Sequence, residues 1–196
     1  MFSINRIVVF LILSNFFIES SFGFIAPVFS VFIIQDIRGG SLAVAGFAAA
    51  VYWIAKSVMQ LFVGRALDKI PGEKDDLWAL VIGHLIMGGA AFLYLLVETP
   101  LHIYIVQFIL ALGGALAIPS WYAMFSRHLD KLKEAFECSL NSSITFGLGV
   151  GVASAVGGLI AEAFGFQAIF ILAGVVGVTS AVTLIPIYKY LERAHA

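Results

Sequence analysis

The sequence predicts an all-α membrane protein that crosses the bilayer as six transmembrane helices. Hydrophobic residues make up 61% of its 196 residues and charged residues 12%, and the mean hydropathy is +1.03. A soluble domain of this length would expose large apolar patches, whereas a bilayer solvates such surface. The apolar residues also form six separate runs of about 20 residues or more, which is long enough to cross the hydrocarbon core as helices.

The six spans are expected, in order along the chain, at 7–34, 42–66, 77–97, 101–126, 139–163 and 166–190. The first follows Arg6 and resembles a signal peptide, but apolar runs recur to the end of the chain, so it is interpreted as a span. The next three spans are followed by loops that contain charged residues. The separation between the last two spans depends only on Glu162, Gly165 and Gln167.

Lysine and arginine residues predict the orientation, because cytoplasmic loops are enriched in them. If the N-terminus is cytoplasmic, nine of these residues lie on the cytoplasmic side: Arg6, Arg65, Lys69, Lys74, Arg127, Lys131, Lys133, Lys189 and Arg193. Only Arg38 lies on the other side, and Lys56 lies within a span. We therefore expect an integral protein of the inner or plasma membrane with both termini in the cytoplasm.

Several classes of function are excluded by composition and missing motifs. The net charge of −1 provides no basic field for nucleic acid. Cys138 is the only cysteine, which excludes an internal disulfide and a cysteine-rich metal site. The sequence contains no intramembrane protease motif, no His-Glu-x-x-His and no nucleotide-binding loop. We expect no enzymatic activity, no metal and no cofactor.

The positions of glycines and prolines predict an internal repeat of three spans. Residues of about 1–98 and 99–196 correspond through these pairs: Gly23 with Gly114, Pro27 with Pro119, and Gly64 with Gly158. The prolines are 92 residues apart and the last two glycines 94. Because each unit has an odd number of spans, the two units are inverted relative to each other. Inverted repeats are typical of secondary transporters.

The stretch after the second span carries the most specific motif. Gly64, Asp68 and Lys69 match the pattern Gly-x-x-x-Asp-Arg/Lys-x-Gly-Arg/Lys-Arg/Lys, and Gly72 belongs to a looser version of its second part. On these residues the chain resembles the major facilitator superfamily. In that family the motif is implied to hold the cytoplasmic side together and to help control conformational switching. A carboxylate at position 68 could also accept hydrogen bonds from a neighbouring helix N-terminus or pair with an arginine.

Two other motifs of this family are incomplete. The fourth-span pattern Arg-x-x-x-Gly-x-Gly is represented by Gln107, Ala111 and Gly113, without its arginine. The fifth-span pattern Gly-Pro-x-x-Gly-Gly becomes 153–158, ASAVGG, without its proline. Because the family associates both motifs with proton-coupled export, these departures argue against a drug/proton antiporter.

The resemblance covers the whole chain but only half of the twelve helices that are usual in the family. It implies a single bundle over 1–196 that corresponds to one half of the major facilitator fold. The chain starts with Met and ends soon after the sixth span, and two copies with both ends on one side can pair in the same orientation. We expect a homodimer that rebuilds the twelve-helix architecture. The alternative is a half that needs a different chain.

Glu19 and Lys56 are the two charged residues near the middle of spans, where charge is costly and usually faces protein or water. With a rise of about 1.5 Å per residue, Glu19 lies roughly 18 Å and Lys56 roughly 15 Å from the cytoplasmic ends of their spans. Glu19 could accept a proton or a substrate cation. The alternative is a structural ion pair between the two residues.

Other polar and aromatic residues extend this candidate pathway: Asn15 one turn from Glu19, Tyr52 and Gln60 on the helix of Lys56, and Gln107, Trp121 and Tyr122 in the fourth span. Trp121 and Tyr122 could instead anchor the helix at the membrane interface. His84 is expected to be structural, because its position in the family lies away from the path.

The sequence therefore predicts a secondary active transporter that moves a small organic solute by alternating access, with possible proton coupling through Glu19. A sugar-like solute, one with polar and apolar parts, or an amphiphilic drug would suit these residues equally. The alternative function is a non-transporting membrane subunit or scaffold that pairs with another chain.

Overall fold

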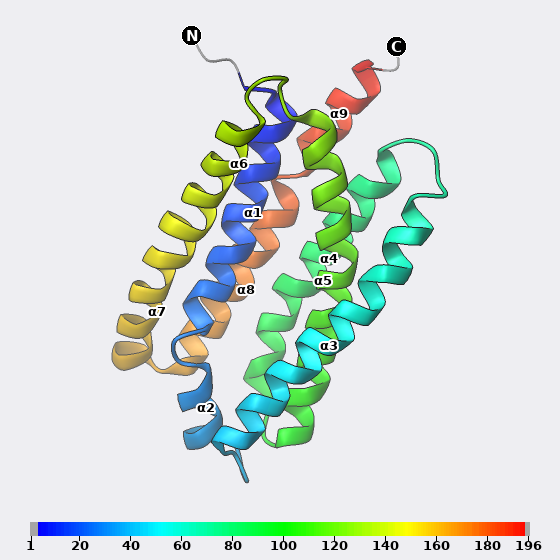
Figure 1. The fold of residues 1–196 in the computed structure, drawn as a ribbon. Helices are drawn as coiled ribbons and strands as arrows, with labels where there is room; N and C mark the ends of the chain where they lie inside the picture. Colours follow the sequence, from blue (N-terminus) through cyan, green and yellow to red (C-terminus); the bar gives the residue numbers. More distant parts are fainter. Residues whose placement is uncertain (1–3, 195–196) are drawn as a thin grey trace.

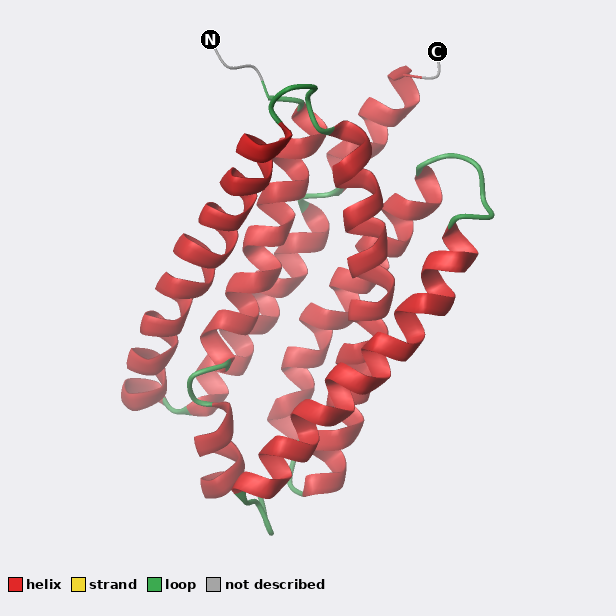
Figure 2. Cartoon of the chain, viewed as in Figure 1, coloured by secondary structure: helices red, strands yellow, loops and turns green. Residues whose placement is uncertain are grey.

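The computed structural model describes residues 4–194, with the side chains described as far as Glu192, and within this range the chain forms helices joined by loops and turns (Figure 1, Figure 2). Six helices in it are long and apolar enough to cross a membrane, as predicted. The helical segments are α1 Arg6–Ile25, α2 Phe29–Asp36, α3 Leu42–Leu67, α4 Lys74–Leu93, η1 Tyr94–Leu96, α5 Pro100–His128, α6 Glu134–Ser142, η2 Ser143–Val150, α7 Gly151–Phe164, α8 Phe166–Val182 and α9 Ile185–Ala194. The ends of the predicted bundle, 1–3 and 195–196, lie outside the described residues.

The first span is shorter than predicted, because the chain turns at Pro27. Helix α1 ends at Ile25, a turn covers residues 26–28, and α2 starts at Phe29. Proline has no N–H to donate, so the helical hydrogen-bond series of α1 stops at Pro27, although Ala26 before it keeps helical backbone angles. Pro119 has the opposite outcome, since α5 continues through it.

The fifth span is one continuous helix whose middle part is a π-helix, η2, between α6 and α7. The wider turn of a π-helix is rare and is often found at functional sites. The span ends where Gly165 adopts φ +80°, a conformation that glycine tolerates best, and α8 begins at the next residue. The predicted boundary between the last two spans is therefore confirmed.

The helices pack as two groups that meet at α4 and α8. Helix α1 packs against η2, α7 and α8, whereas α5 packs against α3 and α4. Helix α3 and the helix formed by α6, η2 and α7 lie on opposite sides of the bundle (Figure 1). Both described chain ends lie at the same end of the bundle as the α3–α4 and α5–α6 loops (Figure 2). We refer to this end as the charged end.

Glycines allow α4 to approach both of its neighbours at backbone distance. A Cβ atom on Gly83 would lie 2.6 Å from the carbonyl oxygen of Gly113 in α5. A Cβ atom on Gly88 would lie 2.5 Å from the carbonyl carbon of Gly177 in α8. In a bilayer the hydrophobic effect does not drive helices together, so contacts of this kind supply much of their association. Helix α4 is therefore held in one rotational position.

Ion pairs tie the charged end together. Arg127, at the end of α5, donates to the buried carboxylate of Asp76 in the first turn of α4. His128 lies 3.4 Å from the carboxylate of Glu73, and its backbone carbonyl accepts a hydrogen bond of 3.2 Å from Asn5. The starts of α1 and α4 are thus joined to the end of α5.

The glycine contacts predict that Gly83→Ala lowers the free energy of unfolding by about 1–3 kcal/mol, because an added methyl group must push two backbones apart. The measurement is thermal and chemical unfolding of the purified chain in detergent. Gly89→Ala on the same helix is the control, since no atom lies within 4 Å of its added Cβ. An equal loss in both variants would contradict this explanation.

The ion pair of Asp76 predicts that Asp76→Asn lowers the free energy of unfolding by about 1.5–3 kcal/mol, the range for hydrogen bonds to charged groups. Asp76 is only 4% exposed, whereas Lys74 and Glu192 form a half-exposed pair at 3.7 Å. Glu192→Gln should therefore cost less than about 1 kcal/mol. A double-mutant cycle of Asp76→Asn with Arg127→Gln measures the coupling, and a coupling near zero would refute it.

Candidate functional site

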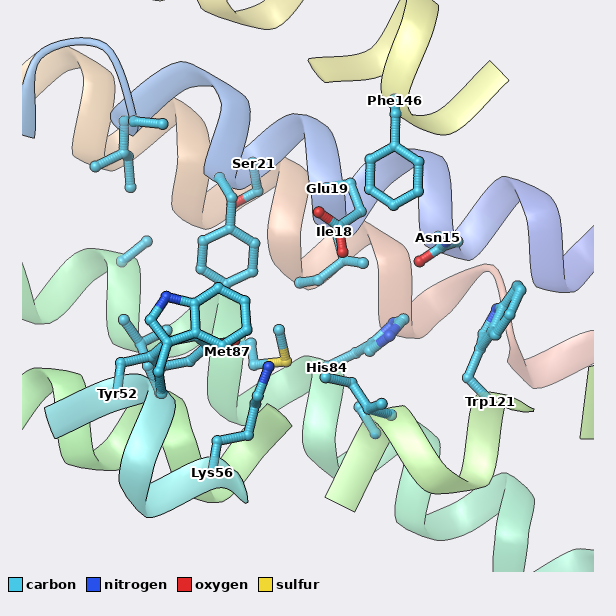
Figure 3. A pocket seen from close by; sticks show the side chains of 18 of the residues that line it. Asn15, Ile18, Glu19, Ser21, Tyr52, Lys56, His84, Met87, Trp121 and Phe146 are labelled. Atoms are coloured by element: carbon cyan, nitrogen blue, oxygen red, sulfur yellow. The ribbon is translucent and has the colours of Figure 1, made fainter. Parts of the chain in front are cut away.

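A cavity of about 830 Å³ lies within the bundle, and residues of α1, α3, α4, α5, α6 and η2 line it (Figure 3). Most of the lining is apolar or aromatic, with a few polar and charged side chains among it. A mostly apolar cavity of this size with a few polar groups is typical of sites for small organic molecules. The chemistry of the cavity therefore depends on those polar groups.

Glu19 and Lys56 line this cavity from α1 and α3. The two described side chains form no ion pair with each other within 4 Å. The ammonium of Lys56 instead lies 3.7 Å from the centre of the Trp53 ring and 5.1 Å from that of Tyr52, in cation–π contact with both. Opposite charges thus reach one cavity without neutralising each other by direct contact.

Asn15 connects α1 to the fifth span. Its side-chain amide donates to the side-chain oxygen of Asn141 at 3.2 Å, and the Thr145 hydroxyl donates to the same oxygen at 3.2 Å. Asn141 lines the cavity beside the start of η2. Sequence reasoning missed this contact. Asn141 and Thr145 are four residues apart on one helix face, but nothing in the sequence indicated that this face meets Asn15.

The fourth span contributes three of the predicted residues to the cavity lining. Trp121 is buried, and its indole N–H donates to the Leu11 carbonyl of α1 at 3.2 Å. Gln107 is also buried and donates to the Tyr94 hydroxyl at 3.1 Å. Tyr122 lines the cavity although it is 65% exposed. Of these three, Trp121 joins the two groups of helices directly.

On α3, Tyr52 lines the cavity with Lys56, but Gln60 is not among the lining residues. An α-helix has about 3.6 residues per turn, so a side chain eight positions along is rotated by about 80° from the first. The stripe predicted from the four-residue spacing therefore turns away from the cavity before it reaches Gln60.

His84 differs from its expected position. The sequence comparison placed it away from the path, but it lines the cavity together with Met87 and Ala91 of the same helix. The close crossing at Gly83 brings α4 against α5 and turns this face inward. The spacing of 84, 87 and 91 is a helical stripe, which is the only signal that could have identified it.

The motif residues Gly64, Asp68, Lys69 and Gly72 lie outside the cavity, at the charged end. A Cβ atom on Gly64 would lie 3.9 Å from Pro119 of α5. Asp68 caps α3 through its backbone N–H, which donates to the Gly64 carbonyl at 3.0 Å, and its exposed carboxylate has no ion pair among the residues that the structure describes. Lys69 is exposed, and Gly72 has φ +118°. Glu73, at a basic position of the motif, lies 3.4 Å from His128, and Asp76, just after the motif, pairs with Arg127.

The arrangement suits reversible binding of an organic solute. Within the described part of the chain, no cluster of His, Cys, Asp and Glu residues could hold a metal ion. The cavity contains an acid, a base, amides and several aromatic rings in one largely apolar space. These groups can bind a molecule that has both polar and apolar parts.

Known proteins match the chain along most of its length. It is 27% identical over 161 residues to an MFS-type transporter of Methanocaldococcus jannaschii, covering 82% of this chain and 40% of that protein. It is 27% identical over 175 residues to the multidrug resistance protein MdtG of Klebsiella pneumoniae, covering 87% of this chain and 41% of that protein. The chain thus spans about two fifths of the length of these relatives.

A solved structure shows the same fold. The crystal structure of the POT family transporter PepTSo superposes with a TM-score of 0.71 at 18% identity, covering 96% of this chain and 38% of that one. The sequence profile of the Major Facilitator Superfamily matches residues 11–196. The Methanocaldococcus relative and PepTSo are both named as transporters. The chain is a member of the Major Facilitator Superfamily.

Proposed function

We propose that this chain is one six-helix half of a secondary active transporter that moves a small organic solute across a membrane by alternating access. The observation that carries the proposal is the cavity, in which Glu19 and Lys56 lie at membrane depth without pairing. Charged groups at that depth are costly and are usually kept for solutes or ions. The proposed membrane is the inner or plasma membrane, with the charged end in the cytoplasm.

The packing supports an arrangement of two inverted three-helix repeats, about 1–98 and 99–196. The first span packs against the fifth, and the fourth packs against the second. The corresponding glycines lie at these contacts: a Cβ on Gly23 would be 3.0 Å from the Ala153 Cβ, and one on Gly114 would be 3.1 Å from the Lys56 Cδ. The middle span of each repeat thus lies against the first span of the other repeat, as expected for two inverted repeats that exchange their middle helices.

A second six-helix unit would cover the two sides of the bundle that are least buried. Within an 18-residue apolar stretch of each span, only 17% is buried within the chain in α3 and 22% in the fifth span, against 44–50% in the other four spans. Both helices line the cavity, so a unit that covered them would also enclose the solute. We propose that the second unit is another copy of this chain, related by a two-fold axis.

A non-transporting subunit or scaffold that pairs with a different chain is the second candidate. The exposed faces of α3 and α7 favour a partner without indicating which one. The same relatives that support transport are more than twice as long as this chain, so a different six-helix unit could complete the architecture.

The homodimer predicts a mass of two chains when the protein is released from lipid nanodiscs in a native mass spectrometer. Val152→Trp on α7 should reduce the dimer, because it enlarges a side chain on the proposed contact face. Val175→Trp on α8 is the matched control, since both valines are more than half exposed but only Val152 lies on one of the two poorly buried spans that form the proposed contact. A monomer that transports, or a copurifying foreign chain required for stability, would refute the homodimer.

Proton coupling through Glu19 predicts that a proton gradient drives solute accumulation in proteoliposomes and that Glu19→Gln abolishes this accumulation. Solutes for the assay are those that stabilise the purified chain in a thermal-shift screen. Without a titrating carboxylate, uptake should fall to the level measured with no gradient, and its dependence on pH should disappear. Glu162→Gln, an exposed acid on α7, is the control. Unchanged pH dependence in Glu19→Gln would exclude the role of Glu19.

A further inference from the structure

His84 is a buried polar side chain that the protein itself leaves without a partner. Its side chain is 3% exposed, and its ring Nδ1 atom is fully buried. No hydrogen bond joins either ring nitrogen to another described residue. Buried polar atoms are nearly always hydrogen-bonded, because leaving one unpaired costs free energy. Nδ1 is buried too deeply to meet a molecule in the cavity, whereas Nε2 is not among the fully buried unpaired atoms, so Nε2 is the ring nitrogen that a partner from outside the chain can reach.

The backbone contacts of α4 hold the His84 ring in the cavity. Gly83, the residue before it, touches the α5 backbone, and Gly88 touches the α8 backbone. With both contacts in place, α4 cannot rotate to turn the ring toward lipid. Figure 3 shows the ring pointing from α4 into the cavity, in the region that Glu19, Lys56 and Trp121 also face. The contacts of α4 therefore keep the His84 ring in this position although its Nδ1 atom has no hydrogen-bond partner.

The chemistry of imidazole indicates which kind of group it would bind. In a neutral imidazole Nε2 is either a donor or an acceptor, depending on the tautomer, and hydroxyl and amide groups can pair with it in either role. A charged group of the solute would instead be drawn to Glu19 or Lys56, which line the same cavity. The lining of this cavity also includes Ile18, Met87 and Leu110, which favour an apolar body.

We propose that His84 is a solute-binding residue that selects a hydroxyl or amide group attached to an aromatic or apolar body. This inference rests on the proposed transport function, since it specifies the class of solute that the cavity takes. It gives the third span a direct part in recognition. The alternative for the unpaired nitrogen is an ordered water, which would give His84 no influence on solute choice.

The test compares three compounds with the same ring and different side chains: tryptophol, indole-3-acetamide and 3-ethylindole. Their binding is measured by calorimetry on the full chain in lipid nanodiscs, with empty nanodiscs subtracted to remove partitioning into lipid. Tryptophol and indole-3-acetamide should bind about tenfold more tightly than 3-ethylindole, as expected for one well-formed hydrogen bond in a dry site.

Two substitutions separate hydrogen bonding from packing. His84→Phe keeps a flat ring but removes both nitrogens, so it should abolish the roughly tenfold preference and leave 3-ethylindole within about twofold. His84→Gln keeps a donor and an acceptor and should retain most of the preference. The inference is refuted if the wild type shows no preference, if His84→Phe retains it, or if His84→Phe weakens all three compounds equally.

A measurement on the wild type covers the case in which a variant does not fold. In chain labelled with ¹⁵N-histidine, tryptophol should shift the ring nitrogen signals of His84 and leave those of the exposed His102 unchanged. The absence of such a shift also refutes the inference.

Flux of the same compounds in proteoliposomes tests the transport proposal separately. If binding depends on His84 but no flux is measured, the transport proposal is refuted and the binding site remains. If flux is measured and is the same in His84→Phe, the inference about His84 is refuted and the transport proposal remains.

Discussion

Close backbone contact between α4 and its two neighbours is the constraint on which the rest of the structure depends. In hydrocarbon, side chains gain little by leaving the lipid for another helix, so association depends on how closely the surfaces fit. Gly83 and Gly113 on one side, and Gly88 and Gly177 on the other, allow three backbones to meet. The helices on either side of α4 are thereby set at fixed positions, and the cavity is the space that remains between α1, α3, α4, α5 and the fifth span.

Charged residues occur in two different settings in this molecule. At the ends of the bundle several are paired, as Asp76 is with Arg127 and Arg38 is with Glu98. Inside the cavity Glu19 and Lys56 have no such partner, although pairing would reduce the cost of burying them. The contact of Lys56 with Trp53 offsets part of the cost of burying the lysine, because an aromatic face attracts a cation without neutralising it. The two settings separate residues that hold the bundle together from residues that remain available to a solute.

The spans could be predicted from the sequence because a bilayer imposes a length and a composition on every helix that crosses it. The effect of each proline on its helix was harder to predict. Pro27 interrupts the first span, whereas α5 continues through Pro119, because the neighbouring helices decide whether a helix can tolerate the missing hydrogen bond. The π-helix η2 leaves no clear pattern. For the site, the charged residues were identifiable by their cost in a membrane, whereas Gln60 and His84 were misplaced because only the rotation of α3 and α4 against their neighbours decides which faces meet the cavity.

The pairing of spans that are distant along the chain has a consequence for how the protein is made. Helix α3 packs mainly against α5, and α1 packs against α7 and α8, which are among the last helices to leave the ribosome. The first helix must therefore stay in the bilayer without its final neighbours during most of translation, with Glu19 still lacking the enclosure that the finished bundle provides. Such a chain depends on the insertion machinery, or on lipid defects that admit water, to shelter an acid until synthesis is complete.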